Sequence, residues 1–109
     1  MLIALQAAAT PVPAAVEADL TCLAVIAMAV DRATPEQRSG LIGGLMYFMG
    51  RIDQVRPGFD YAGQLTRLMN ASDATDKLRA AQPRCSTILR ERGESMQRWG
   101  QALQNSGKR

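Results

Sequence analysis

Apolar residues recur at helical spacing along most of the chain, and no stretch alternates with the period of two that a half-buried strand shows. The first stripe follows a break at Pro11 and Pro13 and predicts a helix over residues 14–32. Acidic residues near its start and Arg32 at its end suit the helix dipole, which supports this assignment. The stripe consists of Val16, Leu20, Leu23, Ala27 and Val30.

The clearest local signal is Thr34-Pro35-Glu36-Gln37, which marks the start of a second helix. Thr34 is a favourable N-cap, Pro35 suits the first helical position, and Gln37 completes a capping box. We expect this helix to run to about Val55, before the turn at 56–58. Two apolar stripes lie side by side on it, one of Leu41, Leu45, Phe48, Ile52 and Val55 and one of Ile42, Met46 and Met49. An apolar arc this wide predicts a central helix covered on more than one side.

Four glycines interrupt the same helix, and each costs about 1 kcal/mol of helix propensity relative to alanine. They are Gly40, Gly43, Gly44 and Gly50. The compensation we expect is close approach of the alanine-rich first helix. The five methionines at positions 28, 46, 49, 69 and 96 are interpreted as core residues, with an adaptable binding groove as the alternative.

The remainder predicts a helix over about 60–69, a short helix ending near Ala81, and a last helix over about 83–104. Pro83 separates the last two because proline disrupts a helix interior. The last helix carries its apolar residues on one face, namely Cys85, Leu89, Met96, Trp99 and Leu103. The chain is therefore predicted to be all-α, a single-domain bundle of four to five helices over residues 14–105 with a tail at 106–109. Its uncharged runs, 20–30 and 39–50, are too short to span a membrane.

Residues 1–13 form a short apolar stretch with a proline-rich end, which resembles the apolar and cleavage regions of a secretory signal. Ala7 to Ala9 supply a candidate cleavage site. No positive charge precedes the apolar stretch, so a complete signal would need a start upstream of Met1. The alternative is a short N-terminal helix that packs on the domain.

Cys22 and Cys85 are the two cysteines of the chain, and each lies on the apolar stripe of its helix. Together with the signal-like start, this favours a disulfide between the first and last helices in an oxidising compartment. The alternative is two buried free thiols in a cytosolic protein. A redox-active role is disfavoured, since there is no Cys-x-x-Cys motif and no histidine to tune a thiolate.

The chain contains no histidine, which removes the commonest general base and the usual zinc ligand. No catalytic motif is recognisable. We therefore expect a protein that is not an enzyme and that holds neither a metal nor another cofactor.

Charge is distributed unevenly, since residues 51–109 carry eleven basic and six acidic side chains. Five arginines crowd the C-terminal region, at positions 79, 84, 90, 92 and 98. A basic half of this kind can bind nucleic acid. Because acids are interspersed and no stacking platform or recognition helix is legible, a mixed solvated surface is the preferred interpretation.

The densest polar cluster surrounds the turn after residue 55. Tyr47, Arg51, Arg56, Asp60 and Tyr61 are the candidate ligand or partner contacts, because two arginines beside aromatic walls can grip a carboxylate or phosphate. The alternative is that these side chains brace the turn. Asp53 and Asp60 have no spacing that favours a catalytic carboxylate pair.

Residues 44–51 (GLMYFMGR) and 84–93, from Arg84-Cys85 to Arg92-Gly93, resemble uncharacterised small secreted helical proteins of alphaproteobacteria. That resemblance covers most of the chain and implies no activity. In architecture, through its export-like start and its one cysteine pair, the chain also resembles the Hde-type periplasmic acid-stress chaperones. This second resemblance implies a dimer that loosens in acid and exposes apolar surface to clients. The arginine-rich half departs from that pattern, and no functional residues are carried over.

These observations predict a small exported helical protein, periplasmic or secreted, that acts by binding in a chaperone-like or inhibitor-like way. The expected partner is a protein, including a second copy of the chain in a homodimer. The alternative is a cytosolic arginine-rich protein that binds nucleic acid and keeps its thiols free.

Overall fold

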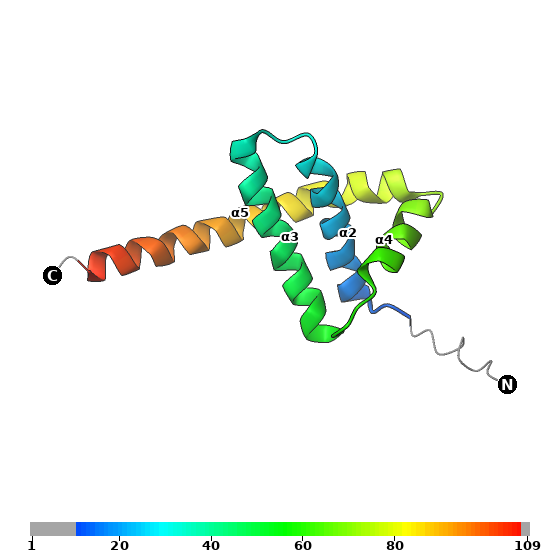
Figure 1. Cartoon of the computed structure of the whole chain (residues 1–109), viewed down its shortest axis with the longest axis horizontal. Coiled ribbons are helices and arrows are strands. Elements are labelled where there is room, and N and C mark those ends of the chain that lie inside the picture. Colours follow the sequence, from blue (N-terminus) through cyan, green and yellow to red (C-terminus); the bar gives the residue numbers. More distant parts are fainter. Residues whose placement is uncertain (1–10, 108–109) are drawn as a thin grey trace.

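The computed structural model describes residues 11–107, which form four α-helices joined by short connections (Figure 1). They are α2 (Ala14–Val30), α3 (Pro35–Val55), α4 (Tyr61–Asn70) and α5 (Ala74–Ser106). No strand occurs within this range, so the all-α prediction is confirmed. Most of the signal-like segment, residues 1–10, lies outside the described residues. None of the described helices has the length and apolar character needed to cross a membrane.

The capping box at the start of α3 forms as predicted. The Gln37 backbone N–H donates to the Thr34 hydroxyl at 3.3 Å, and the Thr34 N–H donates to Gln37 Oε1 at 3.1 Å. At the other end of α3 the chain turns through Gly58, whose φ of 75° is accessible to glycine at little steric cost. Asp60 then caps α4 by accepting a hydrogen bond from the Gly63 N–H at 3.0 Å.

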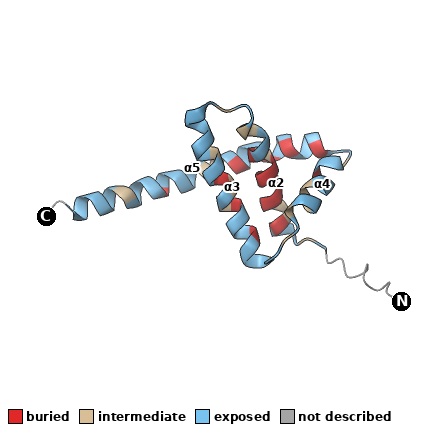
Figure 2. Ribbon diagram, viewed as in Figure 1, coloured by how far each residue is buried: buried red, intermediate tan, exposed pale blue. Residues whose placement is uncertain are grey.

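Helix α2 is the centre of the fold, and α3, α4 and α5 pack around it (Figure 2). Leu20 and Cys22 of α2 are wholly buried, while Phe48 and Ile52 cover it from α3 and Leu68 from α4. The prediction that α3 is central is therefore wrong. Only three residues of α3 are buried, and its second stripe of Ile42, Met46 and Met49 faces solvent. Helix α2 and Leu89 of α5 cover the inner face of α3, and no described residue covers its second stripe.

One glycine of α3 makes the expected close approach. A Cβ at Gly44 would lie 2.8 Å from Leu89 Cδ1 of α5 and 3.4 Å from Ile26 Cδ1 of α2, so three helices meet there. Around Gly40, Gly43 and Gly50 a Cβ would meet no atom within 4 Å. The expectation of close approach is wrong for these three, since they lie on the outer side of α3.

The break predicted at Pro83 is absent, and α5 runs as one helix of 33 residues through it. Proline removes one backbone hydrogen bond and costs about 3 kcal/mol in a helix interior. Buried contacts on both sides offset that cost, because Leu78 and Ala81 before Pro83 and Cys85 after it pack against the core. Tertiary packing thus determines the local structure here.

The C-terminal half of α5 leaves the bundle and projects into solvent (Figure 1). We call residues 90–106 the α5 extension; at 1.5 Å per residue it is about 25 Å long. Met96, Trp99 and Leu103 on it are 61%, 60% and 74% exposed. The sequence placed these three on the same face as Cys85 and Leu89, and the structure shows that this face has no covering element beyond Leu89 within the described chain.

Candidate binding surfaces

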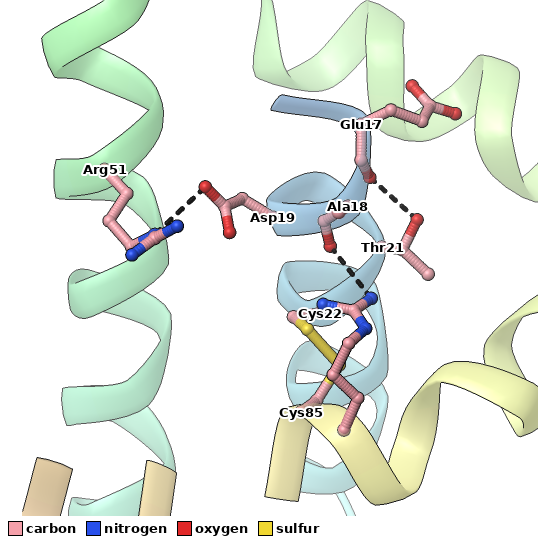
Figure 3. Close-up of a disulfide and its surroundings, with 8 residues drawn as sticks. Glu17, Ala18, Asp19, Thr21, Cys22, Arg51 and Cys85 are labelled. Atoms are coloured by element: carbon pink, nitrogen blue, oxygen red, sulfur yellow. Dashed lines mark hydrogen bonds and ion pairs between the residues drawn. A yellow bond between two sulfur atoms is a disulfide. The ribbon is translucent and has the colours of Figure 1, made fainter. Parts of the chain in front are cut away.

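The disulfide joins α2 to α5, the first and last helices of the described chain, as predicted (Figure 3). The two Cα atoms lie 5.4 Å apart and the two sulfur atoms 2.07 Å apart. Arg84, next to Cys85, donates to the Ala18 carbonyl of α2 at 3.4 Å. Because both cysteines are consumed in one buried bond, neither is available as a thiolate nucleophile.

The predicted polar cluster is divided into two groups, of which the first bridges α2 and α3. Arg51 Nε donates to Asp19 Oδ2 at 3.0 Å, and this hydrogen bond raises the pKa of the guanidinium above its ordinary value (Figure 3). Arg51 also donates to the Tyr47 hydroxyl at 3.4 Å and lies 5.8 Å from the centre of that ring. Asp19 is 7% exposed, so Arg51 supplies the counter-charge that a buried carboxylate requires.

The second group braces the turn between α3 and α4. The Tyr61 hydroxyl lies 2.5 Å from Asp53 Oδ1 and 3.0 Å from the Met49 carbonyl. Burial, followed by the hydrogen bond to Asp53, raises the pKa of Tyr61 to about 12. Arg56 donates to the Pro11 carbonyl at 3.1 Å, and Asp60 is the N-cap described above. Each of the five candidate contact residues thus has a partner within the chain, and a role in ligand binding stays a prediction.

The C-terminal arginines lie on a mixed surface. Arg92 and Arg98 both donate to the Ser95 hydroxyl, at 3.4 and 3.0 Å, and Glu91 and Glu94 are interspersed with them. This arrangement places no continuous row of guanidinium groups along α5. The preferred interpretation of the basic half as a solvated surface stays a prediction.

The interpretation of the methionines as core residues is wrong. Met28, Met46, Met49, Met69 and Met96 are all exposed, with between 39% and 67% of their surface accessible. Periodicity alone did not reveal this, because a helical stripe identifies an apolar face without saying whether a neighbour covers it. Three of these methionines, Met46, Met49 and Met96, lie on two apolar surfaces that the sequence assigned to the core.

The first apolar surface is the outer face of α3, formed by Ile42, Met46 and Met49. The second is the apolar face of the α5 extension, formed by Met96, Trp99 and Leu103. These last three follow one another at i, i+3 and i+7, so they share one side of the helix. Gln97 and Gln101 lie on the opposite, polar side.

Comparison with protein-family models, with curated proteins and with solved structures found no match to this chain. The class of protein that the fold defines is a small, disulfide-linked, all-α domain in which no described residue covers the apolar face of the α5 extension. Function has to be argued from its own surfaces.

Proposed function

We propose that this chain is a non-catalytic binding protein of an oxidising compartment, periplasmic or secreted, that inserts the α5 extension into an apolar groove of a protein partner. The observation that carries the proposal is the exposure of Met96, Trp99 and Leu103 on a helix that projects beyond the bundle. Amphipathic helices that dock in grooves use anchors at i, i+3, i+4 and i+7. The spacing of these three side chains matches that pattern.

The energetics support a docking role. Fully burying one large apolar side chain is worth about 1.5–3 kcal/mol, so three such side chains that are roughly two-thirds exposed offer about 4 kcal/mol. This gross figure corresponds to about a thousandfold in affinity. Tryptophan is also among the residues that most often dominate a protein interface.

The mode of action is inhibitor-like rather than chaperone-like in this proposal. A rigid helix that presents three anchors selects a groove of complementary shape, whereas a general chaperone needs a broad adaptable surface. The methionine-rich face of α3 is the surface that supports the chaperone-like alternative, because methionine adapts to many partners. The buried Cys22–Cys85 bond supports the compartment, since disulfides persist where the environment is oxidising.

Affinity capture from a periplasmic or secreted extract of the native host tests the proposal. The double variant Met96→Ser, Leu103→Ser removes two anchors, and Gln97→Ser, Gln101→Ser is the matched control on the polar side. We expect a partner retained by the wild type and the control but lost with the anchor variant. With that purified partner, the emission of Trp99, the one tryptophan of the chain, should shift to shorter wavelength on binding.

Equal retention of the same partner by the anchor variant and the wild type would contradict docking through α5. Slowed aggregation of a client protein in acid would favour the chaperone-like mode, and dimerisation lost with the anchor variant would identify a second copy as the partner. Retention on DNA at low salt that falls steeply as salt is raised would instead support the nucleic-acid alternative.

A further inference from the structure

A groove separate from both apolar surfaces lies where the C-terminal ends of α2 and α4 meet the first turns of α5. Its volume is about 390 Å³. Val25 and Met28 of α2, Met69 of α4 and Leu78 of α5 form an apolar floor. Leu78 belongs to the core, so the floor is anchored in the fold.

Two guanidinium groups stand at this groove without an ion-pair partner among the described residues. Arg32, in the turn after α2, and Arg79 of α5 are the charged residues that line it, and no aspartate or glutamate lines it. Over residues 11–107, neither arginine makes an ion pair or a side-chain hydrogen bond, whereas Arg51 and Arg67 each pair with a carboxylate of α2. Asp76, one turn before Arg79, lies outside the lining.

An apolar floor beside two unpaired guanidinium groups selects a molecule with an aliphatic body and an anionic end. Arginine presents its N–H groups in a planar fork that matches a carboxylate. A volume of about 390 Å³ lies within the range of roughly 300–1,000 Å³ that small-molecule pockets have. The groove therefore has room for a small aliphatic ligand.

We propose that this groove binds a medium-chain aliphatic carboxylate, with the chain on Val25, Met28, Met69 and Leu78 and the carboxylate between Arg32 and Arg79. Decanoate has the required size and chemistry. The groove contains no residue of the α5 extension, so a test of carboxylate binding gives its result independently of the proposed protein partner.

Titration of the folded, oxidised protein with decanoate below its micelle concentration tests the site, followed by calorimetry and by backbone amide shifts. We expect saturable binding at one site, with the shifts centred on Met28, Met69 and Leu78. Arg32→Gln and Arg79→Gln should each weaken binding about tenfold, because each removes one charge-assisted hydrogen bond. Arg90→Gln, an exposed arginine on the α5 extension, is the matched control and should leave binding unchanged.

Two further ligands test the contributions of the anionic head group and of the aliphatic chain separately. Acetate, which lacks the chain, and decyltrimethylammonium, which reverses the charge, should both fail to saturate the groove. Binding of the cationic amphiphile as tightly as decanoate would overturn the proposal. So would unchanged decanoate affinity in the Arg32→Gln, Arg79→Gln double variant, an absence of saturation, or shifts centred on Trp99. Circular dichroism establishes that each variant is folded, which we expect because both arginines are exposed.

Discussion

Breaking the Cys22–Cys85 bond should cost a large part of the stability of this domain. The bond joins residues 63 positions apart, and the loop-entropy model assigns such a link about 4 kcal/mol. Small domains have only about 5–15 kcal/mol in total. A loss of 4 kcal/mol in a chain of about this size lowers the midpoint of thermal unfolding by roughly 15 °C or more.

Urea unfolding followed by circular dichroism measures the loss in three samples. These are the oxidised wild type, the wild type in reductant, and the double variant Cys22→Ala, Cys85→Ala. The difference in unfolding free energy between the oxidised and the reduced wild type measures the contribution of the disulfide itself. The difference in unfolding free energy between the reduced wild type and the variant measures the cost of removing the two sulfur atoms. This cost comes from a void in the core, because Cys22 and Cys85 are only 0% and 1% exposed. A difference below about 1 kcal/mol between oxidised and reduced wild type would refute the reasoning, which needs the link to restrict the unfolded chain.

Three further predictions concern single positions, and the same unfolding assay checks two of them. Gly43→Ala should stabilise α3 by about 1 kcal/mol, because the added Cβ contacts no other atom. Gly44→Ala should show no such gain, because its Cβ would clash with the Leu89 side chain of α5. Equal effects of the two substitutions would contradict this packing. Arg51→Ala should cost about 1–3 kcal/mol, because it leaves the buried Asp19 carboxylate unpaired. Asp19→Ala should cost at most about 1 kcal/mol, since the half-exposed guanidinium of Arg51 stays hydrated. A larger cost for Asp19→Ala than for Arg51→Ala would refute this reasoning. The Tyr61 phenol should titrate with a pKa of about 12 in an NMR pH titration of the folded protein. Since its folded pKa is raised from 10.0, its contribution to stability should be complete below pH 10 and lost between pH 10 and about 12; a midpoint at 10 would contradict the burial.

The sequence predicted the elements of this fold better than it predicted their arrangement. The helix over residues 34–55 was identified through its cap, because Thr34 and Gln37 interact with backbone only three residues away. Its position in the bundle depends on which neighbours cover it. The two stripes on α3 look alike in sequence, yet Phe48 is buried and Met46 is 67% exposed. No local signal distinguishes the two.

Pro83 illustrates the opposite error, in which a local rule was applied too strongly. The prediction of a break rested on the intrinsic cost of proline, which is correct for an isolated helix. In the folded chain Leu78 before Pro83 and Cys85 after it lie on one apolar face that packs against the core, and the disulfide at Cys85 fixes that face two residues after Pro83. The candidate residues around Arg51 were found because polar side chains are dense in that part of the sequence, but the pairing of Arg51 with Asp19, 32 positions away, depends on tertiary structure.

The apolar face of the α5 extension is a continuation of the core face. Leu89, Met96 and Leu103 are seven residues apart, and such a repeat drifts by only about 20° per heptad around a straight helix. The face that packs on α3 at Leu89 is therefore the face that reaches solvent at Leu103. Most helices in proteins owe their stability to packing rather than to propensity, and Gly93 and Gly100 lower the propensity of the extension further. Continuity with the disulfide-linked half of α5 supplies the nucleus that the extension would otherwise lack. The bond thus fixes the direction in which Met96, Trp99 and Leu103 leave the domain, and the proposed insertion into a groove requires such a fixed direction.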